Sequence, residues 1–247
     1  MTHTFLLTKT TPIEPSLDPF LACDDVKIVH TPVLNISYIP LNINHNEYDS
    51  ADCILVTSPH AVRDFKKNNV PIHIPIYCVG TMTATALRNE GYQNIECCFY
   101  AGSELMSALR NAQQPYKRFI YFRGHNVQHD VKTLCEKLDF SLQEYVVYRA
   151  DFTDHHIDTI RTHIVSESRT TIALYSARGA LSFIDLVEKN DLSHSLARTN
   201  VLCLSDRVLK LVKHFAWKNA YVAHTPTQAS FLEEFKTIIE TDNYTNE

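Results

Sequence analysis

The chain contains 247 residues, of which 45% are apolar and 21% are charged, and its net charge at pH 7 is −5. These values are ordinary for a soluble globular protein with one large or two modest domains, and the negative charge argues against a dedicated nucleic-acid-binding protein. No apolar run reaches the roughly 20 residues that a membrane-spanning helix needs. The apolar segment 5–7 is too short for a signal peptide, so we expect a cytoplasmic protein.

The first 40 residues predict two strands and an extended segment. The strands lie at 5–7 and 26–29, and a helix is predicted at 15–22, where Pro15 and Pro19 limit its extent. Residues 32–39 then alternate in the manner of an extended segment that leaves this body.

From residue 52 onward, short apolar strands alternate with amphipathic helices. The first series predicts strands at 52–57, 75–79, 94–99 and 118–122, each followed by a helix, at 59–68, 81–89, from about 103, and at 127–138. A long strand at 144–149 and a helix at 156–165 follow. The second series predicts strands at 170–175, 200–204 and 219–223, followed by helices at 177–189, 206–215 and 227–240. This alternation indicates parallel sheets with helices on both faces.

Two pieces of the chain occur twice with the same spacing. Residues 54–65 and 172–183 each run from a strand through Ser58 or Ser176 into a helix, and residues 78–94 align without gaps on 203–219. We therefore predict an α/β fold of two similar parallel-sheet domains. Because one strand–helix–strand piece precedes residue 40, one domain is inserted into the other. The predicted domains are 1–37 with 151–247, and 38–150, joined by a two-stranded connector at 32–40 and 145–153; one wide sheet is the alternative.

Polar residues at the starts of the predicted helices define a candidate binding edge. In open parallel sheets, ligands bind beyond the carboxyl ends of the strands, where helix N-termini offer free N–H groups and a positive dipole end. Taken singly, each residue is better explained as a helix N-cap, whereas the set favours a cleft for carboxylates or phosphates equally well. The side chains that we place there are Ser58, His60, Thr81, Thr83, Ser176, Arg178, Ser205 and Thr227.

Arg123 and Tyr148 complete the candidate site. Arg123 ends a strand and could hold a carboxylate, with an ordinary surface arginine as the equal alternative. Tyr148 lies in the second connector, where its hydroxyl could face a ligand or its ring could simply pack. His125 and His129 stand one helical turn apart without a third ligand, which favours a solvated helix start over a metal site. No Ser/His/Asp arrangement can be assigned.

The cysteines and glycines indicate neither a disulfide framework nor a Gly-rich phosphate loop. The seven cysteines form no C-x-x-C pair, and we predict that all are reduced and mostly structural, with Cys53, Cys78 and Cys203 in or beside apolar strands. The adjacent Cys97 and Cys98 fit neither a disulfide framework nor a zinc site. Five glycines in the whole chain leave no Gly-rich phosphate loop.

Short motifs, each loose by itself, match one family in their order and spacing. They are Thr57-Ser58-Pro59-x-Ala61-Val62, Val79-Gly80-x-x-Thr83-Ala84 with Gly91-Tyr92, Tyr121-Phe122-Arg123-Gly124, Val147-Tyr148-Arg149, Tyr175-Ser176 with Gly179, and Thr225-Pro226-Thr227. On these residues the chain resembles the uroporphyrinogen-III synthases over nearly its full length. Two turns depart from the family pattern: Ser205-Asp206-Arg207 replaces a common Gly-Pro-Thr, and Ala177 replaces a proline.

The resemblance implies an active site in the cleft between two α/β domains. The implied substrate is hydroxymethylbilane, a linear tetrapyrrole with eight carboxylates. The implied reaction closes it to uroporphyrinogen III with loss of water and inversion of the last pyrrole ring, without a cofactor or metal. Tyr148 matches the tyrosine proposed in this family to assist departure of the substrate hydroxyl. We expect a monomer that makes at most transient contact with the preceding pathway enzyme and binds neither nucleic acid nor membrane.

Two other hypotheses stay open at this point. One is a non-catalytic, two-lobed binding protein for a small polycarboxylate, and the other is an enzyme that shares only the fold. An assay that separates the type I and type III isomers of the cyclised tetrapyrrole would distinguish the synthase from both alternatives.

Overall fold

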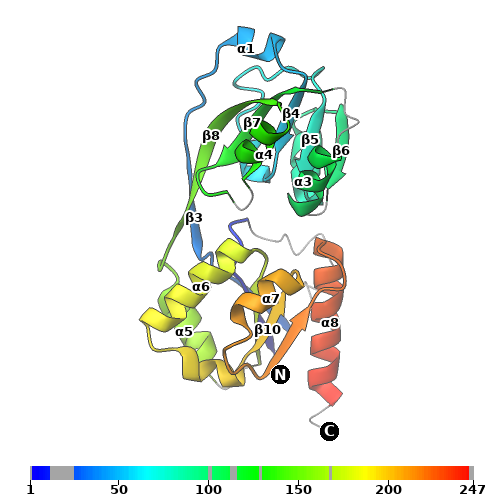
Figure 1. Cartoon of the computed structure of the whole chain (residues 1–247). Coiled ribbons are helices and arrows are strands. Elements are labelled where there is room, and N and C mark those ends of the chain that lie inside the picture. Colours follow the sequence, from blue (N-terminus) through cyan, green and yellow to red (C-terminus); the bar gives the residue numbers. More distant parts are fainter. Residues whose placement is uncertain are drawn as a thin grey trace. The chain divides into compact units, whose positions relative to one another are not determined.

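A computed structural model describes residues 2–11, 25–99, 102–111, 116–127, 130–166 and 169–244. The chain divides into two compact units, here called unit 1 (residues 1–35 and 151–247) and unit 2 (residues 36–150). Each has its own sheet, so the strands do not form one wide sheet (Figure 1). The predicted α/β class with parallel sheets is confirmed.

Unit 1 is built on a five-stranded parallel sheet. Its order is β11-β10-β9-β1-β2, so that the first strand of the chain lies between the second strand and one that comes more than 160 residues later. In register, Phe5 of β1 pairs with Ile28 on one side and Thr171 on the other. The strands are β1 (His3–Leu7), β2 (Val26–His30), β9 (Thr170–Leu174), β10 (Asn200–Cys203) and β11 (Asn219–Val222).

Helices cover both faces of this sheet. Because successive side chains of a strand point to opposite faces, Leu6 packs into the cluster that includes residues of α5 (Ile157–Val165), α6 (Ala177–Lys189) and α7 (Asp206–Val212). Phe5 and Leu7 instead pack with α8 (Gln228–Tyr244), which lies on the other face (Figure 1). A 3₁₀ helix, η4 (Ser193–Arg198), joins the first cluster through Leu196.

Unit 2 has a six-stranded sheet in the order β3-β8-β7-β4-β5-β6. Pairing is parallel from β8 to β6. The edge strand β3 is antiparallel to β8, since the Ile39 N–H donates to the Val147 carbonyl (2.9 Å) and the Thr153 N–H donates to the Val33 carbonyl (3.2 Å). The strands are β3 (Leu34–Tyr38), β4 (Cys53–Val56), β5 (Ile76–Val79), β6 (Ile95–Phe99), β7 (Arg118–Gly124) and β8 (Ser141–Phe152). The chain passes between the units within β3 and β8.

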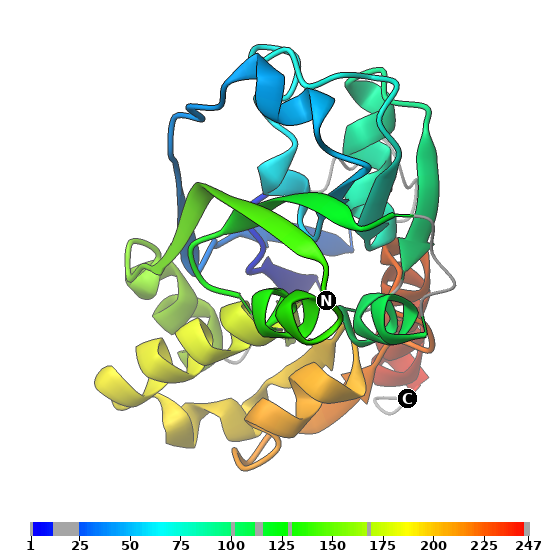
Figure 2. The same cartoon turned by 45° about the horizontal axis from the view of Figure 1, so that its top comes forward.

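The faces of this second sheet are also divided by alternation along the strands. Ile54 and Val56 pack with the segment around η3 (Pro59–Ala61) and with α2 (Thr81–Asn89). Leu55 packs on the other face with α3 (Gly102–Arg110) and α4 (Val131–Lys137), which lie side by side (Figure 2). A short helix, α1 (His45–Asp49), contributes Tyr48 to the first cluster.

The helix predicted at 59–68 is wrong beyond its first turn. Only Pro59–Ala61 is helical, as a 3₁₀ turn, and successive turns follow to Asn69, whose φ is +49°. The Asn68 side chain donates to the Asp64 carbonyl at 2.7 Å. Asn68 and Asn69 favour turn conformations, and Pro71 follows closely, so a longer helix is not stabilised here.

Smaller differences concern helix ends. The helix predicted at 127–138 begins only at Val131, and Val127, expected on its apolar face, is 46% exposed. The helix predicted at 206–215 ends at Val212, whereas the strand predicted at 144–149 extends over 141–152. The prediction at 15–22 lies outside the described residues. Cys53, Cys78, Cys135 and Cys203 are free and buried, as expected. Among the described helices, none combines the length and apolar character needed to cross a membrane.

Candidate functional site

Tyr148 lies against the end of β7. It pairs with Gly124, the last residue of that strand, and the His125 N–H donates to the Tyr148 carbonyl at 2.8 Å. The contact of the ring with Gly124 is so close that a β-carbon on Gly124 would lie 2.6 Å from Cζ of Tyr148. The lack of a side chain at Gly124 therefore places the phenol at the carboxyl edge of the sheet.

His60 packs beside Tyr148, with their ring centroids 5.5 Å apart. Nδ1 of His60 lies 3.2 Å from the hydroxyl oxygen of Tyr38, and the guanidinium of Arg63 lies 4.1 Å above the Tyr38 ring. Burial lowers the pKa of His60, which favours a neutral imidazole at pH 7. Tyr38, His60 and Tyr148 thus form a row of rings at one place in unit 2.

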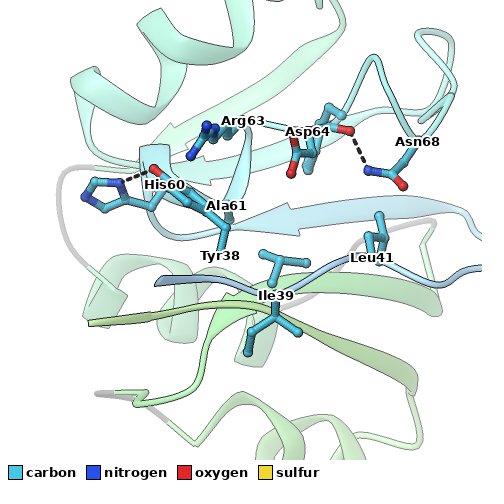
Figure 3. A pocket seen from close by; sticks show the side chains of 10 residues that line it. Tyr38, Ile39, Leu41, His60, Ala61, Arg63, Asp64 and Asn68 are labelled. Carbon is cyan, nitrogen blue, oxygen red and sulfur yellow. Dashed lines mark hydrogen bonds between the residues drawn. The ribbon is translucent and has the colours of Figure 1, made fainter. Parts of the chain in front are cut away.

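A small pocket opens beside this row (Figure 3). Its interior has room for about 10 Å³, roughly one water molecule, and the surrounding hollow is partly open to solvent. Tyr38, His60 and Arg63 give it polar groups, and the apolar side chains of Ile39 and Leu41 face it from the segment that follows β3. The remaining lining residues are Ala61, Asp64, Phe65, Asn68 and Val147.

Ser58 and the two threonines of α2 differ in exposure and in their hydrogen bonds. Ser58 is the N-cap of η3, where its Oγ accepts from the His60 N–H at 3.3 Å. Thr81 is exposed in the first turn of α2, whose N-cap Gly80 has φ +85°. Thr83 is only 1% exposed and belongs to the interior. Thr81 is therefore better placed than Thr83 to meet a ligand.

Arg123 has a protein partner. Its Nε donates to Oε1 of Glu144 at 2.7 Å, and both side chains are mostly buried. Its Nη1 also donates to the carbonyls of Gly124 (3.0 Å) and His125 (3.3 Å). Arg123 is thus paired with a carboxylate of the protein itself, and its predicted contact with a ligand carboxylate stays a prediction. Arg123 supports the turn on which Tyr148 packs.

Unit 1 presents a corresponding edge. Ser176 is the N-cap of α6, and its Oγ accepts from the Gly179 N–H at 3.0 Å. The guanidinium of Arg178 lies 5.1 Å from the centre of the Phe152 ring. Ser205 is the N-cap of α7 without a side-chain bond to the helix. Thr227 accepts from the Ser230 N–H at 3.3 Å just before α8.

The structure thus brings Ser58, His60, Arg123 and Tyr148 to one edge of unit 2. Ser176 and Thr227 likewise lie at one edge of unit 1, where β9 and β11 end. Sequence reasoning missed Tyr38, Gly124 and Lys9. Lys9 lies two residues beyond the end of β1 and could have been found by listing the polar residues that follow each strand. Within the described ranges, no three His, Cys, Asp or Glu side chains are grouped to hold a metal; His125 is exposed, and His129 is not described.

Two solved structures share the fold at low sequence identity. A uroporphyrinogen-III synthetase from Helicobacter pylori is 14% identical, with a TM-score of 0.65 over 96% of this chain and 100% of that one. A mutant uroporphyrinogen III synthase from Thermus thermophilus is 14% identical, with a TM-score of 0.62 over 97% and 100%. No curated protein sequence matches the chain. The family model of uroporphyrinogen-III synthase HemD matches residues 23–233, most of the chain, and therefore this protein belongs to the uroporphyrinogen-III synthase family.

Proposed function

We propose that this protein is the enzyme that closes hydroxymethylbilane to uroporphyrinogen III, a lyase reaction that releases one water. The observation that carries the proposal is the family match over residues 23–233. It supports an enzyme of tetrapyrrole biosynthesis. No observation favours the alternative of a non-catalytic binding protein.

The substrate's carboxylates call for several dispersed anion-binding groups. The first turns of α2 and α6 supply N–H groups and positive dipole ends, with exposed Thr81 and half-buried Arg178 as polar side chains there. The turn before α7 is less suitable, because Asp206 puts a negative charge in its first turn. We infer that backbone N–H groups carry much of the binding, and that the Ser205-Asp206-Arg207 turn contributes less than its counterpart elsewhere in the family.

The pocket lined by Tyr38, His60 and Arg63 is too small to enclose part of such a ligand. Its interior has room for about 10 Å³, roughly one water molecule, far below the roughly 300–1,000 Å³ of typical small-molecule sites. The tetrapyrrole therefore does not bind inside this pocket.

Tyr148 is the side chain that we assign to the chemical step. The C–O bond of the hydroxymethyl group breaks, and the phenol donates its proton to the departing oxygen, so that water leaves. The electrophilic methylene carbon left behind forms a C–C bond to the substituted α-carbon of the last pyrrole ring. The older C–C bond from that ring carbon to the neighbouring methylene bridge then breaks, and the bridge bonds instead to the unsubstituted α-carbon of the same ring. The hydrogen of that carbon leaves as a proton, which restores the pyrrole and returns a proton to the phenolate. An ordinary phenol has a pKa of about 10 and is protonated at neutral pH, as this role requires. Because the linear substrate is inherently reactive, positioning dominates catalysis.

A product-isomer assay tests the proposal. Purified, metal-free protein is mixed with fresh hydroxymethylbilane, and the products are oxidised and separated into type I and type III porphyrins. We expect the type III isomer in excess over a control without protein. If only the spontaneous type I isomer accumulates, the protein is not this synthase.

A further inference from the structure

A lysine at the carboxyl edge of unit 1 stands without a negatively charged partner in the described part of the chain. Lys9 follows β1, and its Nζ donates to the amide oxygen of Gln228 at 3.3 Å. The same ammonium lies 5.2 Å above the centre of the Tyr175 ring. No described carboxylate forms an ion pair with it.

The surroundings of Lys9 disfavour its charge unless an anion joins it. Its side chain is half-buried, and burial lowers the pKa of the ammonium. One amide oxygen and one aromatic face stabilise an ammonium less than a carboxylate does. Nearby, the hydroxyl oxygen of Tyr175 is buried and has no hydrogen-bond partner among the described residues. Polar groups of this kind normally have partners, so a group that binds here could supply the missing hydrogen bond.

Two of the three segments that meet here carry predicted binding residues. Tyr175 immediately precedes Ser176, and Gln228 immediately follows Thr227. All three lie where parallel strands β1, β9 and β11 end, which is the edge at which such sheets bind ligands. Lys9 adds a full positive charge to this edge. Its ammonium has three N–H donors, of which one donates to Gln228, so two can donate to a ligand.

We propose that Lys9 binds a carboxylate of the anionic tetrapyrrole within unit 1, between the Tyr175–Ser176 turn and the Thr227–Gln228 turn. The inference rests on the proposed function for the identity of the ligand, but it assigns a residue outside the motifs that define the family resemblance. Lys9 is a binding residue in this scheme, and it takes no part in bond breaking.

The alternative is a structural lysine that only packs on Tyr175. Three variants separate the two roles. Lys9→Met keeps the length and the apolar stem and removes the charge, Lys9→Gln removes the charge with a shorter polar chain, and Lys9→Arg keeps the charge. Lys210→Met, at an exposed position of α7, is the matched control for loss of one surface charge.

The variants are compared in two measurements besides thermal unfolding. One is the KM and kcat for formation of the type III isomer from hydroxymethylbilane. The other is the Kd for uroporphyrin III, a stable porphyrin with eight carboxylates, from protein fluorescence at low and high salt. We expect Lys9→Met to raise KM and Kd about 10- to 100-fold, the range of one charge-assisted hydrogen bond, with kcat changed less. Lys9→Arg and Lys210→Met should stay within about 3-fold of the parent, since both leave a charge at position 9.

Distinct outcomes overturn the two proposals. If the parent forms type III isomer but Lys9→Met and Lys9→Gln keep the parental KM and Kd, the inference about Lys9 is wrong. The same holds if Lys9→Arg is as impaired as Lys9→Met, because then packing and not charge matters. If the parent forms no type III isomer, the proposed function fails, while the porphyrin Kd still tests Lys9. Lys9→Gln provides the test if Lys9→Met does not fold.

Discussion

Gly124 and Tyr148 are coupled by contact: the phenol fills the space that any side chain at position 124 would need. A β-carbon there would lie 2.6 Å from Cζ and 2.8 Å from the hydroxyl oxygen of Tyr148. Such distances are not tolerated, so the ring must shift if the glycine is replaced. The two residues therefore act as one feature of the site.

Gly124→Ala is expected to reduce type III formation about 10- to 100-fold, because displacing a reacting group by about 1 Å has an effect of this order. Thermal stability should fall only modestly, since the conformation of Gly124 does not require glycine. Parental activity in Gly124→Ala would show that the position of the Tyr148 ring is not critical.

Tyr148→Phe keeps the ring and deletes the proton donor. We expect kcat to fall about 10- to 1,000-fold, the range for loss of one donor to the transition state, with little change in melting temperature. Tyr116→Phe removes an exposed hydrogen bond to Glu96 (3.4 Å) and serves as the control. If Tyr148→Phe cyclises at the parental rate, the phenol is not the acid; if stability falls together with activity, its role is structural.

Ser176 has a capping role that can be separated from ligand binding. Ser176→Ala removes the acceptor for the Gly179 N–H and should lower the free energy of unfolding by about 1 kcal/mol. Ser176→Asp keeps an N-cap acceptor but adds a negative charge beside the substrate, so we expect stability to be retained and KM to rise. Urea unfolding and steady-state kinetics measure the two effects. An unchanged KM in Ser176→Asp would restrict Ser176 to capping the helix.

Arg123 and Glu144 should behave as a coupled pair. Removing either partner, in Arg123→Gln or Glu144→Gln, leaves a mostly buried group without its ion pair (2.7 Å). We expect each to lower the free energy of unfolding by about 1–2 kcal/mol, and the double variant to lose less than the sum. Activity should fall in both, because the turn at Gly124 and His125 loses its support. Additive losses would show that the pair contributes no specific energy.

The lowered pKa of His60 predicts that the free energy of unfolding decreases at mildly acidic pH. Its pKa in the folded protein is lowered by burial, so the unfolded chain, where histidine has a pKa of about 6.5, binds the proton more tightly. The contribution of His60 to the free energy of unfolding is therefore fully present above about pH 6.5, and it is lost as the pH falls from there toward the pKa of the folded protein. The difference in the free energy of unfolding between pH 7.5 and 5.5 should be smaller in His60→Asn than in the parent. An equal difference would mean that other groups, such as His156 and His163, account for it.

The sequence by itself determined the class of fold. Short apolar runs of Val, Ile and Leu alternate with amphipathic segments, and this pattern depends only on local periodicity and on burial of both sheet faces. The repeated strand–Ser–helix pieces likewise located Ser58 and Ser176 at strand ends. Both serines are N-caps in the structure, because capping needs only the hydroxyl and the next few backbone groups.

Tertiary structure decided what surrounds those positions. Residues 54–65 and 172–183 have the same pattern, yet the first forms a 3₁₀ turn and the second a 13-residue helix. Lys9, just after β1, meets Tyr175 and Gln228 only because β1 pairs with a strand far along the chain. Tyr148 contacts Gly124 only through the register of β7 and β8. Contacts of this kind depend on strand order and register, which the packing of the whole sheet selects and which no local pattern of residues encodes.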